Sequence, residues 1–207
     1  MTRKIATAFL LLCALAVSGQ AAQKGKKKVA PRDYANTLAV LQTDMGDITL
    51  KFYYDKAPRH VENFIDLAAK GFYDQTMFHR VIPGFMIQAG DPLTKKPEDP
   101  KHPYGTGGNV GADGKEARVK AEFNDTTHKR GVLSMARASD PNSASSQFFI
   151  VVKDSPFLDH QYTAFGEVVS GMEVADKIAA APRNASDRPN QPIRIKKVVL
   201  SQAKSLS

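Results

Sequence analysis

The fold is decided by residues 78–91, Phe-His-Arg-Val-Ile-Pro-Gly-Phe-Met-Ile-Gln-Ala-Gly-Asp, an apolar stretch that carries a few polar side chains. The Pro-Gly dipeptide at its centre favours a turn, so the stretch predicts two short strands that fold back on each other. Strand alternation places Arg80 and Ile82 on one face of the first strand. It also places Met86 and Gln88 on one face of the second strand, across the Pro83-Gly84 turn. We therefore expect an arginine, a glutamine and apolar side chains to line one surface.

A second apolar segment follows the same pattern further along the chain. Residues 131–137 are Gly-Val-Leu-Ser-Met-Ala-Arg, and residues 145–151 are Ser-Ser-Gln-Phe-Phe-Ile-Val after a loop of small residues. Alternation along the latter run puts Gln147 and Phe149 on one side of a strand.

The rest of the chain predicts many short strands and two helices. Residues 38–41 and 48–53 are expected strands around a turn, because Ile, Leu and Phe alternate with polar residues in the second run. Pro58 fits the first turn of a helix, and a second helix is expected from Ser170, with Glu173 completing a capping box. Further strands are expected at residues 131–136, 147–152, 164–169 and 193–200. This pattern favours a mainly antiparallel barrel or sandwich, with residues 91–120 as an irregular excursion.

Composition and charge exclude several classes of protein. The chain has 207 residues, of which 42% are hydrophobic and 24% charged, as in ordinary globular proteins. The net charge is +8, but residues 34–207 contain 22 Lys and Arg against 20 Asp and Glu, so the excess lies in an N-terminal tail. We therefore expect no nucleic-acid partner. The one cysteine, Cys13, lies in the leader, which leaves no thiol for a disulfide, a nucleophile or a zinc site after cleavage.

The N-terminus has the layout of a secretory signal peptide. Arg3 and Lys4 precede an apolar run from Ile5 to Val17, and small residues follow it. We predict a cleavable signal peptide at 1–22, a basic flexible linker at 23–35, a single domain at 36–202 and a short tail at 203–207. The alternative is an uncleaved anchor helix, although the run is short for a membrane span. We expect a periplasmic protein without stable membrane insertion after cleavage.

Common catalytic motifs are absent from the sequence. It has no zincin pattern and no Gly-x-Ser-x-Gly elbow, and the glycines at 105–111 have the wrong spacing for a dinucleotide loop. A Ser-His-Asp triad stays open, although nothing in the sequence favours it. We expect no metal site and no cofactor.

Several of these segments together resemble the cyclophilin family of peptidyl-prolyl cis/trans isomerases. They are residues 78–91, Gly105–Gly108, Ser146–Phe149, Glu62–Phe64, Phe157–Asp159 and Phe165–Gly166. The resemblance extends from about Asn36 to Leu200. It implies a closed eight-stranded antiparallel barrel capped by two helices, and an enzyme that accelerates rotation about X-Pro bonds.

The resemblance also implies roles for single residues. Arg80 corresponds to the family's catalytic arginine, and Gln88 to a residue that binds the substrate backbone. The proline pocket corresponds to Phe85, Met86, Phe149 and Leu158, with Phe157 and Tyr162 beside it. The groove for residues preceding proline corresponds to Gly107, Ala136 and Gln147.

Four positions depart from the eukaryotic-type pattern. Phe157 stands in place of Trp, Tyr162 in place of His, Arg137 in place of Asn, and Ser145 in place of Gly. Since Phe157 lacks an indole N–H donor, we expect weak binding of cyclosporin, the family's inhibitor. Arg137 adds a charge beside the groove. The replacements at Arg137 and Ser145 resemble the bacterial exported (periplasmic) branch of the family.

Prolyl isomerisation suits these residue types. Rotation meets an amide barrier of about 18–20 kcal/mol because conjugation at the proline nitrogen is lost in the twisted state. An arginine can lower this barrier by donating a hydrogen bond to that nitrogen, without titrating. The reaction needs no nucleophile. We therefore expect a monomeric isomerase that acts on proline-containing, partly folded exported proteins. The alternative function is a proline-peptide-binding module or holdase chaperone with little turnover on the same barrel. For single residues, the alternatives are that Arg80 is a surface arginine and that Phe85, Met86 and Phe149 are core residues.

Overall fold

The computed structural model describes residues 33–203 of the chain. The predicted signal peptide at 1–22 lies outside these residues, as do positions 23–32 of the linker and 204–207 of the tail. Within the described part, no helix is long and apolar enough to cross a membrane.

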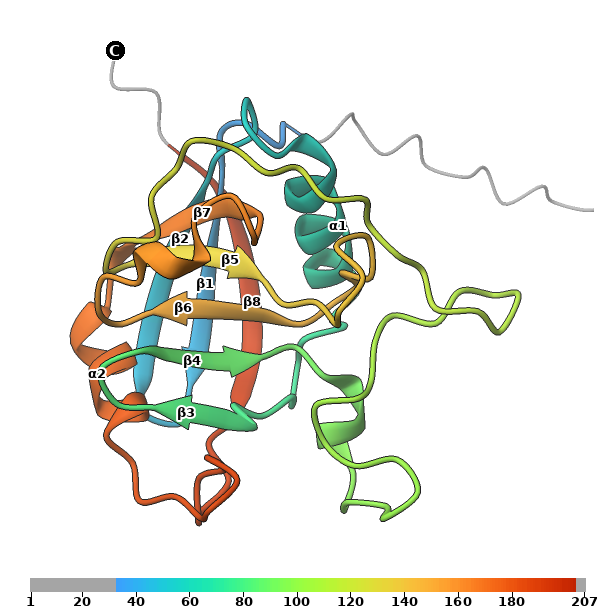
Figure 1. The fold of residues 1–207 in the computed structure, drawn as a ribbon, viewed down its shortest axis with the longest axis vertical. Coiled ribbons are helices and arrows are strands. Elements are labelled where there is room, and N and C mark those ends of the chain that lie inside the picture. Colours follow the sequence, from blue (N-terminus) through green and yellow to red (C-terminus); the bar gives the residue numbers. More distant parts are fainter. Residues whose placement is uncertain (1–32, 204–207) are drawn as a thin grey trace, which may run out of the picture. The chain divides into compact units, whose positions relative to one another are not determined.

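Eight strands form one sheet in which every pair is antiparallel (Figure 1). The strands are β1 (Thr37–Thr43), β2 (Gly46–Phe52), β3 (Arg80–Ile82), β4 (Met86–Ala89), β5 (Val132–Met135), β6 (Phe148–Val151), β7 (Ala164–Ser170) and β8 (Ile195–Gln202). Their order across the sheet is β3-β4-β6-β5-β7-β2-β1-β8. The helices are α1 (Pro58–Ala69) and α2 (Met172–Ala179), with 3₁₀ turns η1 (Pro92–Lys95) and η2 (Pro156–Leu158).

The mainly β, eight-stranded antiparallel prediction with two helices is therefore confirmed. The two edge strands, β3 and β8, are joined through the residues that precede them. Met77 and Arg194 form an isolated antiparallel bridge, and the Phe78 amide donates to the Ile193 carbonyl at 2.9 Å. The sheet is thus a curled half-barrel, and the residues that precede its two edge strands meet each other.

The first hairpin matches its sequence pattern. Ile48, Leu50 and Phe52 are buried, whereas the residues between them are partly or fully exposed. The period of two therefore places one face of β2 against the core, as alternation predicts. Both strands are longer than predicted, and the connection is the two-residue turn Asp44-Met45.

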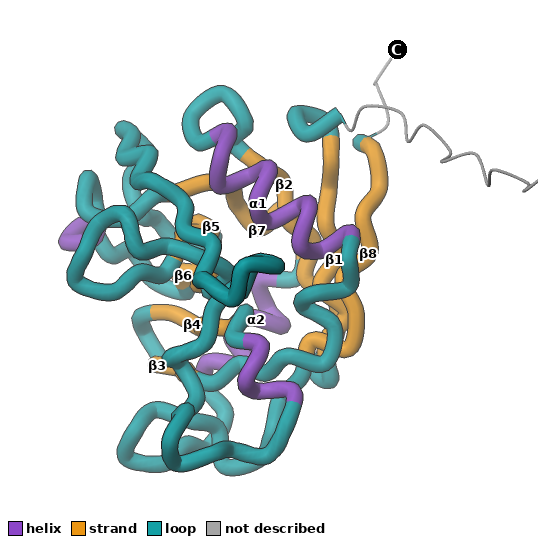
Figure 2. Tube along the Cα trace, turned by 90° about the vertical axis from the view of Figure 1, so that its right-hand side faces the viewer, coloured by secondary structure: helices purple, strands orange, loops and turns teal. Residues whose placement is uncertain are grey.

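Helix α1 begins at Pro58, as predicted, and packs against β7 and β8 (Figure 2). Its own N-cap residue supplies no side-chain hydrogen bond. Instead the Glu122 carboxylate, from a distant loop, accepts from the backbone amides of Arg59 at 3.2 Å and His60 at 3.1 Å. A carboxylate at this end is also favoured by the helix dipole.

The predicted start of α2 at Ser170 is wrong. Ser170 is the last residue of β7, and the N-cap is Gly171 in the left-handed region at φ 89°, so no capping box with Glu173 forms. A Cβ on Gly171 would lie 2.2 Å from the Asp47 carbonyl oxygen. The close approach of this turn to β2 requires glycine and determines where the helix begins.

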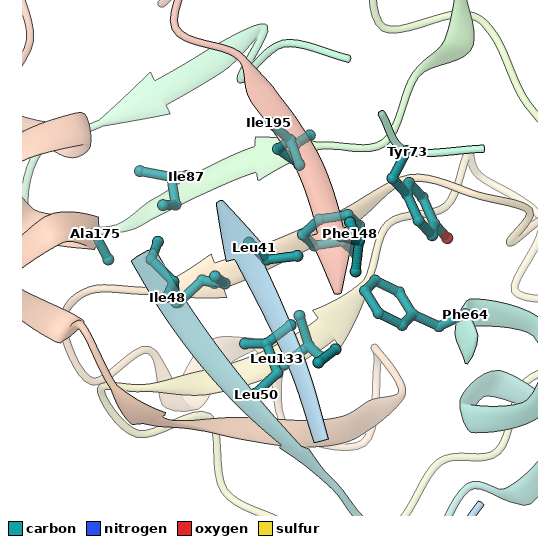
Figure 3. Packing of buried hydrophobic residues seen from close by; sticks show 14 of the residues in the cluster. Leu41, Ile48, Leu50, Phe64, Tyr73, Ile87, Leu133, Phe148, Ala175 and Ile195 are labelled. Atoms are coloured by element: carbon teal, nitrogen blue, oxygen red, sulfur yellow. The ribbon is translucent and has the colours of Figure 1, made fainter. Parts of the chain in front are cut away.

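The main hydrophobic core lies inside the curled sheet and is covered by both helices (Figure 3). Phe64 of α1 packs edge-on against Phe148 of β6, with ring centroids 5.2 Å apart, and stacks on Tyr73 at 4.8 Å. Ala175 of α2 reaches the core from the opposite end. We call this set the inner cluster.

Candidate active site

The β3–β4–β6 ladder carries the candidate site on its outer face. Arg80 pairs with Gln88, which in turn pairs with Phe149 across the ladder. The alternate residues Val81 and Ile87 are fully buried in the inner cluster. The predicted common face for the arginine, the glutamine and the apolar side chains is therefore present, and its orientation follows from strand alternation.

A cavity of about 480 Å³ lies over this face. Eight of the predicted site residues line it, namely Arg80, Phe85, Met86, Gln88, Ala136, Phe149, Leu158 and Tyr162. A neighbouring groove of about 370 Å³ is lined by Gly107 and Gln147, together with Gln88 and Ala136. Ten of the eleven residues predicted for the site thus surround two adjoining hollows.

Phe157 is the exception, because it lines neither hollow. Its side chain is 61% exposed, and its ring lies 5.3 Å from that of Phe85 at the cavity rim. It can meet only a ligand that extends beyond the cavity.

The floor of the cavity is apolar. Met86, Phe149 and Leu158 are buried and belong, with Val132, Val151 and Ala164, to a second hydrophobic group that we call the outer cluster. Tyr162 meets the Phe149 ring edge-on at 5.7 Å. Such a floor can accept a small apolar ring and keep water away from it.

Arg80 stands beside this floor, and its side chain is 47% exposed. Its Nε lies 3.7 Å from Oδ2 of Asp187, in the loop between α2 and β8. The same loop is joined to β3 because the Val81 amide donates to the Asp187 carbonyl at 2.8 Å. The ion pair at Nε leaves the two terminal nitrogens of the guanidinium available to a ligand.

Gln88 and Gln147 are linked to each other and to the glycine loop. The Gln88 amide donates to Oε1 of Gln147 at 2.9 Å, and Nε2 of Gln147 donates to the carbonyls of Gly105 at 3.0 Å and Gly107 at 2.8 Å. Both amide hydrogens of Gln147 are thus directed to the groove wall. In this arrangement Gln147 holds the wall in place.

Buried Asp91 holds the same loop from behind. Its Oδ2 accepts from the amides of Gly105 and Gly107, the latter at 3.3 Å, and its Oδ1 accepts from the Leu93 amide at 2.8 Å. A Cβ at position 107 would lie 2.2 Å from Oδ1 of Asp91, so only glycine fits there.

The far wall of the cavity consists of residues that the sequence did not indicate. Arg188 forms two hydrogen bonds with the Glu98 carboxylate, at 2.6 and 2.8 Å, and lies 4.8 Å from the centre of the Tyr104 ring. The bonds from Arg188 lower the pKa of Glu98. Since Arg188 and Glu98 are separated by 90 positions, no local pattern could have identified the pair.

Arg137 also lines the cavity. Its Nε donates to the Gln161 carbonyl at 3.1 Å, and its Nη1 donates to the carbonyls of Ala138 at 2.8 Å and Ser139 at 3.3 Å. The guanidinium also lies 4.6 Å from the centre of the Tyr162 ring. These contacts hold the cation in one orientation.

A Ser-His-Asp row does occur behind the cavity floor. Nδ1 of His128 lies 2.9 Å from the Asp159 carboxylate, and its Nε2 lies 3.0 Å from the Ser134 hydroxyl, which is also 3.0 Å from the Thr163 carbonyl. Burial lowers the pKa of His128. Because Ser134 is fully buried, no substrate can reach its hydroxyl, and the row supports the floor instead. Between residues 33 and 203 no group of three side chains has the geometry of a metal site.

Comparisons with known proteins agree with this geometry. Residues 38–200 match the family model described as "Cyclophilin type peptidyl-prolyl cis-trans isomerase/CLD". The chain is 41% identical over 160 residues to the isomerase ppi1 of Schizosaccharomyces pombe, which covers 77% of this chain and 96% of that one. It is also 41% identical over 175 residues to peptidyl-prolyl cis-trans isomerase A of Dickeya dadantii, covering 82% and 84% respectively.

A solved structure shows the same fold. A cyclophilin type isomerase of Cryptosporidium parvum, crystallised in the presence of the dipeptide Ala-Pro, superimposes with a TM-score of 0.70 at 33% identity. The match covers 80% of this chain and 99% of that chain.

Proposed function

Because the chain belongs to the cyclophilin-type peptidyl-prolyl cis-trans isomerases, we propose that Arg80 and the cavity beside it catalyse rotation about X-Pro bonds during the folding of exported proteins. The observation that carries this assignment of the site is the juxtaposition of one cation with an apolar floor. The guanidinium of Arg80 and the rings of Phe85 and Phe149 line the same cavity.

The apolar floor would hold the proline ring while the preceding carbonyl turns. Met86, Phe149 and Leu158 offer a buried surface to the ring, and water has little access to it. As the amide twists, the proline nitrogen becomes pyramidal and gains a lone pair that can accept a hydrogen bond. A pocket that fixes the ring therefore confines rotation to the one bond that must turn.

Arg80 would stabilise the twisted state. Its terminal nitrogens donate to the proline nitrogen only when conjugation is lost, because the planar ground state offers no lone pair there. This is binding that is stronger in the transition state than in the ground state, which is the condition for acceleration. The ion pair between Nε and Asp187 leaves those nitrogens unpaired.

The ligand class follows from the same site. The Cryptosporidium parvum relative was crystallised in the presence of Ala-Pro. We extend this to the present chain, whose substrates would be proline-containing, partly folded polypeptides. The residues preceding proline would lie along the groove formed by Gly107, Ala136 and Gln147.

Export is supported by the sequence of residues 1–22, with its basic start, apolar run and small residues before the linker. Expression of the full chain in a bacterium, followed by fractionation and mass determination of the N-terminus, tests this part. A chain shortened by about 22 residues in the periplasmic fraction supports export. A full-length chain in the cytoplasm or the membrane would contradict it.

Catalysis is tested with a short Ala-Pro peptide in exchange-resolved NMR. Added protein should increase the cis/trans exchange rate at concentrations far below that of the peptide. If the peptide binds without faster exchange, the domain is a proline-binding module or holdase and the proposal for the cavity fails.

A further inference from the structure

The charges around the cavity are unequally compensated. Among the described residues that line it are three arginines, Arg80, Arg137 and Arg188, and no aspartate or glutamate. Arg80 has Asp187 as a partner at 3.7 Å, which it shares with Arg183 at 3.3 Å, and Arg188 has Glu98 at 2.6 Å. Arg137 is hydrogen-bonded to carbonyl oxygens, and no carboxylate within residues 33–203 forms an ion pair with it. Of these three arginines, Arg137 is therefore the one without an ion pair to a described residue.

This cation is also preorganised. Three backbone carbonyls and the face of the Tyr162 ring hold the Arg137 guanidinium, and its Nη2 makes none of these hydrogen bonds. A side chain that is already fixed loses little conformational entropy when a ligand binds to it. A carboxylate would therefore meet a donor that needs no rearrangement.

Its position relates it to a particular part of the substrate. Arg137 lines both the cavity and the neighbouring groove, and Tyr162, on which it stacks, touches Phe149 of the apolar floor. The junction of the two hollows is where a chain leaving the proline pocket toward the groove must pass. The groove does contain one carboxylate, Glu116, but Arg118 pairs with it at 3.3 Å.

We propose that Arg137 is a specificity-determining residue, which favours substrates with an acidic side chain at one of the two positions preceding proline. This inference rests on the proposed function, since it assumes that the cavity holds proline and that the groove holds the residues before it. Arg137 does not act on the proline nitrogen. It contributes binding energy through the flanking carboxylate.

The expected preference is modest, because Arg137 is partly exposed and its field is screened by salt. An exposed charge pair in water corresponds to a factor of about 1.5 to five in kcat/KM. At 0.5 M salt the factor should fall toward one, since the Debye length then becomes shorter than about 5 Å.

The test compares peptides that differ only in charge. Exchange rates are measured at low salt for Ala-Glu-Pro, Ala-Gln-Pro and Ala-Lys-Pro peptides, and for Glu-Ala-Pro, Gln-Ala-Pro and Lys-Ala-Pro peptides. In at least one of the two series, the full chain should have a kcat/KM for the Glu peptide about 1.5 to five times that for the Gln peptide, and a lower one for the Lys peptide. Arg137→Gln should abolish this ratio, and Arg137→Lys should retain part of it. Lys197→Gln, which removes an exposed positive charge on β8, should leave the ratio unchanged and so controls for net charge.

Ratios within one variant separate specificity from folding damage, because a destabilised variant loses rate with all peptides alike. Equal kcat/KM for Glu, Gln and Lys peptides in the wild type, with Ala-Pro exchange still accelerated, would overturn the role of Arg137 and leave the isomerase site intact. A Glu preference that survives Arg137→Gln would also overturn it. If no peptide is accelerated, the proposed function itself fails.

Discussion

The inner and outer clusters occupy opposite faces of the same strands, and they differ in what lies beyond the apolar residues. Phe148 and Phe149 are neighbours in β6, yet Phe148 packs against Phe64 and Tyr73 in the inner cluster, whereas Phe149 faces the cavity. Both are almost completely buried, at 0% and 5% exposed. Burial alone therefore does not distinguish a residue that stabilises the fold from one that forms the site.

The difference lies in the closure of each cluster. Both helices cover the inner cluster, so its side chains have protein on every side. The outer cluster lies next to Arg80, Gln88 and Arg137, and beyond them is a cavity that a ligand can fill. We therefore expect the inner cluster, which is covered by the protein itself, to contribute mainly to the stability of the fold. We expect the outer cluster, which borders a cavity, to contribute mainly to ligand binding.

The largest expected effects on stability and activity come from replacing Phe148 and Phe149 one at a time. Phe148→Ala should lower the free energy of unfolding by about 3–5 kcal/mol, because it leaves a cavity in a closed core. Phe149→Ala should lower it less, while reducing kcat/KM for an Ala-Pro peptide at least tenfold. Urea denaturation and exchange NMR on both variants measure the two quantities.

Equal losses of stability in Phe148→Ala and Phe149→Ala would contradict the proposed difference between the inner and outer clusters. The same holds if Phe149→Ala keeps wild-type activity, since the outer cluster would then be ordinary core. Phe149→Leu, which keeps an apolar side chain, should recover much of the stability with a smaller part of the activity.

Acid should weaken both clusters through their buried histidines. Burial lowers the pKa values of His60, which lies 6.3 Å from the Phe165 ring in the inner cluster, and of His128, which lies 6.3 Å from the Phe149 ring in the outer one. A histidine with a folded pKa below its unfolded value of about 6.5 binds more protons when the chain unfolds. The folded protein therefore has its full stability above about pH 6.5, the unfolded pKa, and loses stability as the pH falls below it.

Between pH 7.5 and 5.5 the free energy of unfolding should decrease by up to about 1.4 kcal/mol per pH unit for each such histidine. Urea denaturation at a series of pH values measures this slope. Replacing one histidine, as in His128→Asn, should make the slope shallower. A flat profile in the wild type would show that the buried rings carry no such penalty.

Replacement of Phe157, at the cavity rim, should have a smaller effect, which concerns the affinity for cyclosporin. Phe157 is 61% exposed and contacts Phe85 at the cavity rim, so a ligand must extend beyond the cavity to reach it. We predict weak cyclosporin binding by the wild type. Phe157→Trp adds an N–H donor and should tighten it by about fivefold, the value of one net hydrogen bond. Calorimetric titration of both proteins measures the ratio, and Ala-Pro exchange should respond much less. An unchanged affinity would remove Phe157 from the binding surface.

The smallest predicted effect concerns the orientation of Arg80. Asp187→Asn removes the carboxylate 3.7 Å from its Nε but keeps a similar shape, so kcat/KM should fall about threefold, as befits an exposed ion pair. In an Arg80→Ala background the same change should have no further effect. An equal loss in both backgrounds would mean that Asp187 supports only the loop.

The sequence predicted those parts of the molecule that depend on local periodicity. Alternation across the turn at Pro83-Gly84 placed Arg80 and Gln88 on one face, and the ladder confirms it. The sequence pattern predicted a wrong start for α2 at Ser170, because this start depends on a contact with β2, which no local pattern encodes. For the same reason it missed Asp187, whose role depends on a contact across the sheet edge.

The family resemblance supplied what periodicity could not. Alternation identifies the outer face of β6 but cannot tell whether Phe149 meets solvent, protein or a cavity. Motif similarity predicted a proline pocket there, and the structure brings Phe149 together with Met86 and Leu158 around a hollow. The wall formed by Tyr104 and Arg188, with Glu98 as the ion-pair partner of Arg188, matched no sequence motif and became visible only in the fold.

The most direct test of the account is the exchange rate of an Ala-Pro peptide with the wild-type chain and with Arg80→Ala. Arg80 is half exposed and lies outside the inner cluster, so its removal should leave the unfolding transition unchanged. We predict strong acceleration by the wild type and a loss of about a hundredfold in kcat/KM on Arg80→Ala, comparable to the loss of one transition-state donor. Equal acceleration by both proteins would contradict the catalytic role of Arg80, because catalysis would then reside in the apolar cavity alone.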